Sequence, residues 1–510
     1  MSSSFDFRNQ VTKLKLDKIS PSFCAAKWTQ VTLHLGNGTN HSCHHPAVHS
    51  FDPEEVAKNP NALHNTKEKK EFRKQMLNGE RPQECDYCWR VEDANVEKVG
   101  TPDEVFSDRI TKSGEPWSSP FIEDIKNSKW DDDFYPKYVE IDFENTCNFK
   151  CAYCSPSYSS QWQKEIRDHG PYVMETDPHL NFNSMEDIMA HSKVPMKPDD
   201  NPYIKAFWGW FPEAVKHMHH FRVTGGEPLM SKNLMKVLDY LIENPQPNLH
   251  FNINSNLNPT QELFDKFLGK VDTLLKNNCV RDIRIYTSGE AHGEQCNYIR
   301  DGMDYDEWIK NINIVLTRFP ENLYISIMST VNALSTQTYK LFLQDMLEIR
   351  TAHTTEIRRQ PIALDFPYLR HPEFLAVWVL DKNSLKIFED TVKWMESISY
   401  SGKYQDGYES NDDPKDMINV NKVWTRFHEH EITGLKRVLE TAYGVSNKRE
   451  SEGNLVSLRR SFYSFVTEYD KRRGKNFCEV FPTLENFYYA CEHEYENELA
   501  KKITVINVNE

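Results

Sequence analysis

The chain has 510 residues, of which 38% are hydrophobic, and its net charge is −15 at pH 7. This length allows two to four domains at roughly 150 residues each. The longest apolar runs, such as residues 374–380, fall far short of the roughly 18 residues that a membrane span needs, and the N-terminus lacks the apolar stretch of a secretory signal. The acidic balance works against nonspecific nucleic-acid binding. We therefore expect a cytoplasmic protein without membrane spans.

Four of the 11 cysteines precede residue 100, at Cys24, Cys43, Cys85 and Cys88. In a reducing compartment, clustered thiols are more often metal ligands than disulfides. Four thiols can close one tetrahedral site, and the metal can be zinc or an iron–sulfur cluster. Several nearby histidines could replace a thiol, namely His41, His44, His45 and His49.

A second part of the chain alternates short apolar runs with amphipathic stretches, which is typical of βα units on a parallel sheet. Six strands are predicted, at residues 138–143, 220–224, 249–254, 282–287, 323–328 and 362–366. Helices are predicted at residues 232–243, 262–276, 305–319 and 338–350. Six such units predict an α/β fold, a partial (β/α)6 barrel of the TIM type.

Other segments depart from this rhythm. Residues of about 170–205 are rich in prolines and polar side chains and are predicted to be an insertion. Residues after about 376 are predicted to be mainly helical, with a polar loop near 404–416. The basic run at 470–475 could hold a phosphate or carboxylate, or be a solvated face.

Three further thiols follow the first predicted strand of the array, at Cys147, Cys151 and Cys154. Loops after barrel strands open at the catalytic face. Three cysteines leave one iron of a [4Fe–4S] cluster without a protein ligand. An open coordination site is typical of a catalytic metal centre and not of a structural one. A structural zinc site is the alternative, because thiolate ligands alone do not identify the metal.

The spacing CxxxCxxC, with the aromatic Tyr153 before its last cysteine, resembles the defining motif of the radical S-adenosylmethionine (SAM) superfamily. A second resemblance follows at the end of the next predicted strand, in the turn Gly225-Gly226-Glu227-Pro228. In that family such a turn binds the SAM amino group. Glycines allow close backbone approach, and the Glu227 carboxylate can accept from an ammonium group.

Weaker resemblances extend the implied SAM site. Asn254 ends the third strand and Ser288 ends the fourth, while Arg300 follows in residues 298–305. In relatives, the strand-end serine and a later arginine contact the ribose or carboxylate of SAM, although Arg300 could equally be a surface charge at a helix start. Val331, after the fifth strand, could meet the adenine, but the family's adenine motif is missing there.

The order and spacing of the N-terminal cysteines resemble the twitch domain, a shortened SPASM domain that carries an auxiliary [4Fe–4S] cluster. In this chain the module would precede the barrel, as in one subgroup of radical SAM proteins. The expected division is an extension at 1–19, a twitch-like module at 20–110, the barrel at 130–375 and a helical region at 376–510.

The resemblance implies reductive cleavage of SAM to a 5′-deoxyadenosyl radical, which removes a hydrogen atom from the substrate, and oxidation of the substrate radical with help from the auxiliary cluster. An external donor such as flavodoxin or ferredoxin would supply electrons. A sugar, aminocyclitol or nucleotide-like substrate is slightly favoured over a ribosomally made peptide, and a noncatalytic zinc scaffold is the remaining alternative. Candidate proton acceptors are Asp142, Glu144, Glu290 and His292, and none is assigned as the catalytic base.

Overall fold

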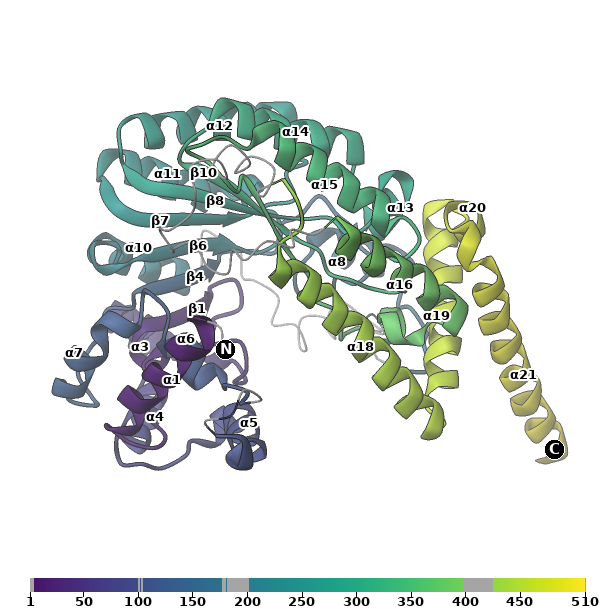
Figure 1. The fold of residues 1–510 in the computed structure, drawn as a ribbon, viewed down its shortest axis with the longest axis horizontal. Coiled ribbons are helices and arrows are strands. Elements are labelled where there is room, and N and C mark those ends of the chain that lie inside the picture. Colours follow the sequence, from purple (N-terminus) through teal and green to yellow (C-terminus); the bar gives the residue numbers. More distant parts are fainter. Residues whose placement is uncertain are drawn as a thin grey trace.

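The computed structural model describes residues 4–99, 101, 104–176, 180, 201–398 and 425–509. Its centre is a mostly parallel, nine-stranded sheet in the order β11-β10-β8-β7-β6-β4-β1-β2-β3, with helices along it (Figure 1). The expected α/β class is confirmed. Most of the predicted insertion, and the polar loop near 404–416, lie outside the described residues.

All six predicted strands are present as neighbouring parallel strands of this sheet. They are β4 (Tyr138–Asp142), β6 (His220–Thr224), β7 (Gln246–Asn254), β8 (Val280–Ser288), β10 (Leu323–Met328) and β11 (Ile362–Asp365). Apolar residues alternate with polar ones along β6 and β8, because only one face of each strand packs against the helices.

The four predicted helices are also present, one with the predicted ends and three with ends that shift by one to three residues. They are α11 (Lys232–Glu243), α12 (Gln261–Lys276), α14 (Tyr305–Arg318) and α15 (Tyr339–His353). Side chains that accept from the first helical turn fix two of the starts: Ser231 accepts from Asn233 N, and Asp304 accepts from Glu307 N. Other helices between the strands are α8 (Ser160–His169), α10 (Pro202–Ala214) and α13 (Gly293–Ile299).

The N-terminal region contributes directly to the sheet. Strand β1 (Gln30–His34) pairs in parallel with β4, and β2 (Thr39–His41) and β3 (His49–Ser50) extend it in antiparallel fashion. The helices of this region are α1 (Ser4–Asp17), α2 (Ala26–Thr29), α3 (Pro53–Lys58), α4 (Lys67–Leu77), α5 (Asp86–Ala94), α6 (Asp108–Ser113) and α7 (Ile122–Asn127). A small core of their own, including Leu16, Trp28 and Trp89, packs around two of the cysteines.

After the sheet the described chain is mainly helical, as predicted. The helices are α16 (Lys382–Ser397), α18 (Glu429–Ser451), α19 (Leu455–Arg473), α20 (Phe477–Val480) and α21 (Glu485–Asn509). None of the helices described is long and apolar enough to cross a membrane.

The basic run at the end of α19 is solvated mainly at Lys471, whose side chain is 76% exposed. Arg472 and Arg473 are almost fully buried, and Arg473 Nη2 lies 2.9 Å from Glu165 Oε2 in α8. Lys475 Nζ lies 3.2 Å from Asp301 Oδ1 in the short strand β9 (Arg300–Asp301). These ion pairs attach the helical region to α8 and β9. The run therefore binds carboxylates, as one sequence-based interpretation expected, and these carboxylates belong to the protein itself.

One face of the sheet is lined by polar side chains in register. Tyr138, His220, His250 and Asp282 form one row across four strands. A second row contains Glu140, Arg222, Asn252 and Arg284. Burial, followed by the fields of His250 and His219, lowers the pKa of His220 to about 3, so this ring is uncharged at neutral pH.

Candidate functional site

The three cysteines of the CxxxCxxC motif lie in a loop at the carboxyl end of β4. Cys147 is buried, and Cys151 and Cys154 are partly exposed. Cys151 belongs to the two-residue strand β5 (Lys150–Cys151), which pairs antiparallel with β9. Phe149 N lies 3.4 Å from Cys147 Sγ, a donor contact that suits a thiolate. The loop is therefore fixed by its own backbone and by β9.

The Gly225–Pro228 turn at the end of β6 packs directly against this loop. Gly226 N donates to Glu144 O at 3.2 Å, and Glu227 N donates to Thr146 O at 2.7 Å. Gly225 adopts a φ of +125°, which favours glycine. The cysteine motif and the glycine turn lie about 70 residues apart in the sequence. Main-chain hydrogen bonds to Glu144 and Thr146, just before Cys147, thus join them.

Glu227 is buried and bonded within the protein. Its carboxylate accepts from Leu229 N at 3.0 Å, from Ser255 Oγ at 2.8 Å and from Asn256 N at 2.7 Å. Burial raises the pKa of this carboxyl to about 7, against the lowering effect of these donors. Glu227 therefore connects its turn to the loop after β7, and much of its accepting capacity is already used.

Arg300 is buried, so its alternative interpretation as a surface charge is wrong. Its Nε donates to Glu290 Oε2 at 2.9 Å, and its Nη2 donates to the Tyr153 hydroxyl. Its Nη1 lies 3.8 Å from Cys151 Sγ. Burial raises the pKa of Glu290 in spite of the Arg300 charge. The arginine links β9, Glu290 and the aromatic residue of the cysteine motif.

The other implied SAM contacts lie at the same edge of the sheet. Asn254 is the last residue of β7, Ser288 is the last residue of β8, and Val331 follows β10. The Asn254 side chain accepts from Arg222 Nε at 2.9 Å. Val331 is fully buried, and its N and O bond to Pro367 and Leu369. The parallel strands thus bring these residues to the edge that carries the cysteine loop.

The candidate proton acceptors already have partners. Asp142 contacts His34 of β1, and Glu144 accepts from Ser231 Oγ at 2.6 Å and from Thr146 Oγ1 at 2.9 Å. His292 is partly exposed and lies 3.5 Å from Asp345. Glu144 is the nearest of these to the cysteine motif along the chain.

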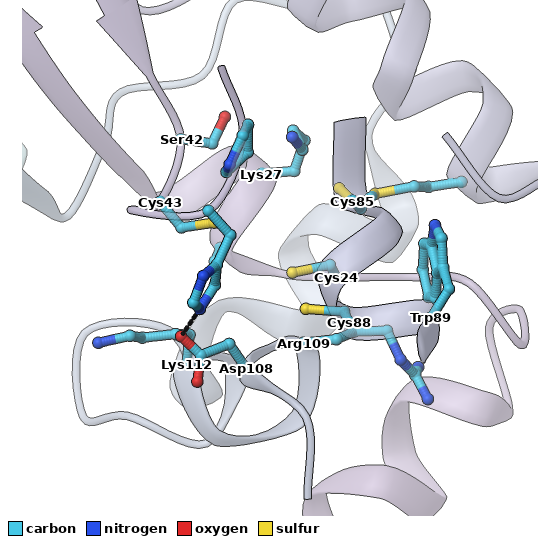
Figure 2. Close-up of a pocket in the computed structure, with 14 residues that line it drawn as sticks. Cys24, Lys27, Ser42, Cys43, Cys85, Cys88, Trp89, Asp108, Arg109 and Lys112 are labelled. Atoms are coloured by element: carbon cyan, nitrogen blue, oxygen red, sulfur yellow. Dashed lines mark hydrogen bonds and ion pairs between the residues drawn. The ribbon is translucent and has the colours of Figure 1, made fainter. Parts of the chain in front are cut away.

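The four N-terminal cysteines line one cavity, which Figure 2 shows. Cys24 precedes α2, Cys43 follows β2, and Cys85 and Cys88 lie at the start of α5. Segments that lie up to 64 residues apart therefore contribute thiols to one place. Burial raises the pKa of the Cys85 thiol to about 12, so a bound cation or nearby positive charge is needed to hold it as a thiolate.

Two buried cations face these thiols. Lys27 is buried and paired with Glu84, which also accepts from His49 Nε2 at 2.6 Å. Burial lowers the pKa of Lys27, but the fields of Cys85, Glu84 and Cys43 outweigh it and raise the pKa overall. Arg109 lines the cavity and pairs with Glu92 at 2.7 Å. Their positive charge suits an anionic group held by thiolates.

The histidines near Cys43 have partners other than the thiols. His45 stacks on Tyr87 at 3.6 Å and lies 2.9 Å from Asp108. His49 lies between Glu84 and Glu68, and His41 Nε2 lies 3.0 Å from His34 Nε2. His45 nevertheless lines the cavity together with the four cysteines, so its imidazole is a further potential donor.

No three thiol sulfurs of either cysteine set lie within 4.8 Å of one another. Among the described residues, the one group of three or more potential ligands that meets this limit is His219, His220 and His250. Thiol side chains can rotate toward a bound metal, so the cysteine sets are compatible with zinc and with an iron–sulfur cluster.

Sequence reasoning missed Lys27, Glu84 and Arg109 as parts of the N-terminal site. A signal was present for two of them, because Lys27 follows Cys24 by three residues and Glu84 directly precedes Cys85. Arg109 lies 21 residues beyond the last cysteine of the set, and only the tertiary structure brings it there.

The chain matches no protein-family model and no curated protein in sequence comparisons.

Proposed function

We propose that this chain is a radical SAM enzyme that cleaves SAM reductively and uses the resulting 5′-deoxyadenosyl radical to abstract a hydrogen atom from its substrate. One observation carries the proposal. The Cys147 loop at the end of β4 is joined by main-chain hydrogen bonds to the glycine turn after β6 and to β9. Three features that the resemblance assigns to one SAM site are therefore in contact.

The residues at this loop fit a [4Fe–4S] cluster. Cys147, Cys151 and Cys154 would supply three thiolates and leave one iron open for SAM. Arg300 Nη1, at 3.8 Å from Cys151 Sγ, offers a positive charge to such a thiolate set. When bound, the cluster would supply the electron that cleaves SAM, and the protein would supply orientation and exclude water.

The surrounding residues would position SAM at the open iron. We assign the main chain of Gly225 and Gly226 to the SAM amino group, because the bonding of Glu227 within the protein favours a positioning role for its carboxylate. Ser288 and Asn254 would contact the ribose or carboxylate of SAM. Arg300 would act mainly by fixing Tyr153 beside the cluster.

The N-terminal cysteines would hold an auxiliary [4Fe–4S] cluster. Four thiols that line one cavity and the buried cations Lys27 and Arg109 beside them support this assignment. The region would then be a twitch-like module placed before a partial (β/α)6 barrel. A cluster held by Cys24, Cys43, Cys85 and Cys88 would supply an acceptor for the electron of the substrate radical, which would give a net oxidation of the substrate.

The polar side chains on one face of the sheet support the proposal of a small, polar substrate. Arg222 Nη1 lies 3.7 Å from Glu140 Oε2, and the guanidinium lies 4.0 Å from the ring centre of Tyr286. Arg284 donates to Ser326 Oγ at 3.0 Å. Such charged and hydroxyl-bearing side chains suit a sugar, aminocyclitol or nucleotide-like molecule, and a peptide is the alternative that binding experiments would reveal. Flavodoxin or ferredoxin in the cytoplasm would supply electrons.

The experiment purifies the full chain without oxygen and counts iron and sulfide. It then measures 5′-deoxyadenosine with dithionite as reductant, in the wild type and in Cys147→Ala/Cys151→Ala/Cys154→Ala. We expect about eight irons per chain in the wild type, half of them retained in the triple variant, and SAM cleavage only in the wild type.

Other outcomes separate the alternatives. About four irons together with bound zinc would keep the enzyme but make the N-terminal site structural. Zinc without iron, and no cleavage of SAM, would overturn the proposal in favour of a noncatalytic scaffold.

A further inference from the structure

Three histidines come together across two central strands, at the amino-terminal end of β6 and in the middle of β7. His219 directly precedes β6, His220 is its first residue, and His250 is opposite His220 in β7. One ring nitrogen from each lies within 4.8 Å of the other two, and all three side chains are partly buried. Neither cysteine set contributes to this cluster.

The backbone of this cluster is fixed independently of its side chains. The main-chain nitrogens of His219 and His220 both donate to Lys137 O, at 2.8 and 2.9 Å. The nitrogen of His250 donates to His219 O at 2.9 Å. The backbone that carries the imidazoles is therefore ordered before a ligand binds. Binding of a common ligand then costs little further conformational entropy.

A carboxylate orients one of the rings. His250 Nδ1 lies 2.9 Å from Asp282, the next residue in the same cross-strand row. An N–H from Nδ1 to this carboxylate leaves the lone pair on Nε2, as in the carboxylate–histidine pairs that support metal ligands. His219 Nδ1 and His220 Nδ1 lie only 2.7 Å apart, so two ring nitrogens that could ligate a metal ion are close together.

We propose that His219, His220 and His250 bind a divalent first-row transition metal, with Zn²⁺ as the expected ion and Asp282 as a positioning residue. Uncharged imidazoles are good ligands for Zn²⁺, and three of them leave a fourth position for water. This site stands independently of the proposed SAM chemistry. It lies at the opposite end of β6 from the Gly225 turn, about 16 Å away along the strand.

The experiment uses the full chain with its cysteine sites loaded with iron and sulfide, so that thiols do not compete for added metal. Zn²⁺ is titrated against a coloured chelator, and Co²⁺ is titrated as a spectroscopic probe. The variants are His220→Gln, His250→Gln and Asp282→Asn. The control is His217→Gln, which removes a nearby, more exposed histidine that stacks on Tyr135.

We expect the wild type and the His217→Gln control to bind one Zn²⁺ per chain more tightly than any further Zn²⁺. His220→Gln and His250→Gln should lose this tightly bound Zn²⁺. Asp282→Asn should weaken binding about 10- to 100-fold. The difference spectrum of the wild type, with Co²⁺ minus without it, should show ligand-field bands of nitrogen and oxygen ligands and no new thiolate charge-transfer bands.

Unchanged Zn²⁺ stoichiometry in folded His220→Gln would overturn the proposal. So would a wild-type Co²⁺ spectrum with only thiolate bands or with no bound cobalt, and this measurement does not depend on the folding of any variant. Loss of SAM cleavage with normal Zn²⁺ binding would count against the proposed function alone.

Discussion

Gly226 lies so close to the carbonyl oxygen of Thr146 that a Cβ atom on residue 226 would come within 2.3 Å of it. The neighbouring contact with Asn145 would also be too short, at 2.7 Å. Both of these partners are main-chain atoms, so no side-chain rotation can relieve the clash. The two residues therefore link the position of the glycine turn to the position of the cysteine loop.

We predict that Gly226→Ala separates the turn from the loop. SAM cleavage should fall by about 100-fold, because displacement of about 1 Å at a reacting centre has effects of this size. The three thiols remain, so iron content should change little. Rate measurements and iron analysis of the same preparation test both expectations.

Gly269→Ala is the matched control. Gly269 lies inside α12, and a Cβ atom there meets nothing within 4 Å. Alanine should stabilise the helix by up to about 1 kcal/mol and leave cleavage unchanged. Full activity in Gly226→Ala would refute the coupling between turn and loop.

The N-terminal cysteines give a second prediction. Cys85→Ser should remove about half of the iron and abolish turnover of the substrate, while SAM cleavage without substrate oxidation persists. Cys279→Ser, which changes a buried thiol outside both sets, should retain all of the iron. Iron analysis and 5′-deoxyadenosine assays distinguish the two variants, and equal iron content in both would rule out a cluster at Cys85.

Local patterns predicted the central sheet well. The strand β6 and the helix α11 have the predicted ends. Both patterns, the alternation of apolar with polar residues and the spacing of apolar residues by three or four, can be recognised within a short stretch of sequence. The cysteine motif and the Gly225–Pro228 turn could be paired from the sequence because the resemblance supplied the relationship. The structure adds the hydrogen bonds that hold them together.

Long-range pairing was beyond such patterns. Arg473 binds Glu165, which is 308 residues away, and no local feature of a basic run indicates such a partner. The addition of β1 to the sheet was missed for a related reason, since residues 30–34 are short and lie next to a region dominated by cysteines and histidines. The histidine cluster was missed because its members come together only when β6 and β7 pair.

The buried pair of Arg300 and Glu290 gives a prediction on stability. Arg300→Met leaves the Glu290 carboxylate buried and without its cation, which should cost about 3–5 kcal/mol of unfolding free energy. The double variant Arg300→Met/Glu290→Gln should recover most of this loss, because no buried charge remains. Urea unfolding of the apoprotein measures both.

Arg318→Met is the control for this pair. Arg318 and Asp272 form an ion pair on the surface, which is worth only about 0–1 kcal/mol. If Arg300→Met were no more destabilising than Arg318→Met, the Arg300 pair would not have the structural role described above.

The pair of Arg350 and Glu431 predicts how stability depends on pH. Both side chains are fully buried and lie 2.5 Å apart at their closest atoms, joining α15 to α18. Burial raises the pKa of Glu431, but the charge and hydrogen bonds of Arg350 outweigh it and hold the pKa below its ordinary value of 4.5. The ionised form is therefore favoured by folding.

A depressed pKa in the folded state stabilises the protein above the pKa of the unfolded chain, and this stability is lost as the pH falls through the folded-state value. We predict that Glu431→Gln lowers the unfolding free energy by about 3–5 kcal/mol at pH 7. The gap to the wild type should close progressively below about pH 4.5, because protonation then removes the same charge from the wild type. Urea unfolding at several pH values tests this, with Glu213→Gln as a control, because Glu213 is exposed and its ion pairs with Lys216 and His217 should give only a small gap. A gap that stayed constant down to pH 3 would mean that folding does not lower the pKa of Glu431.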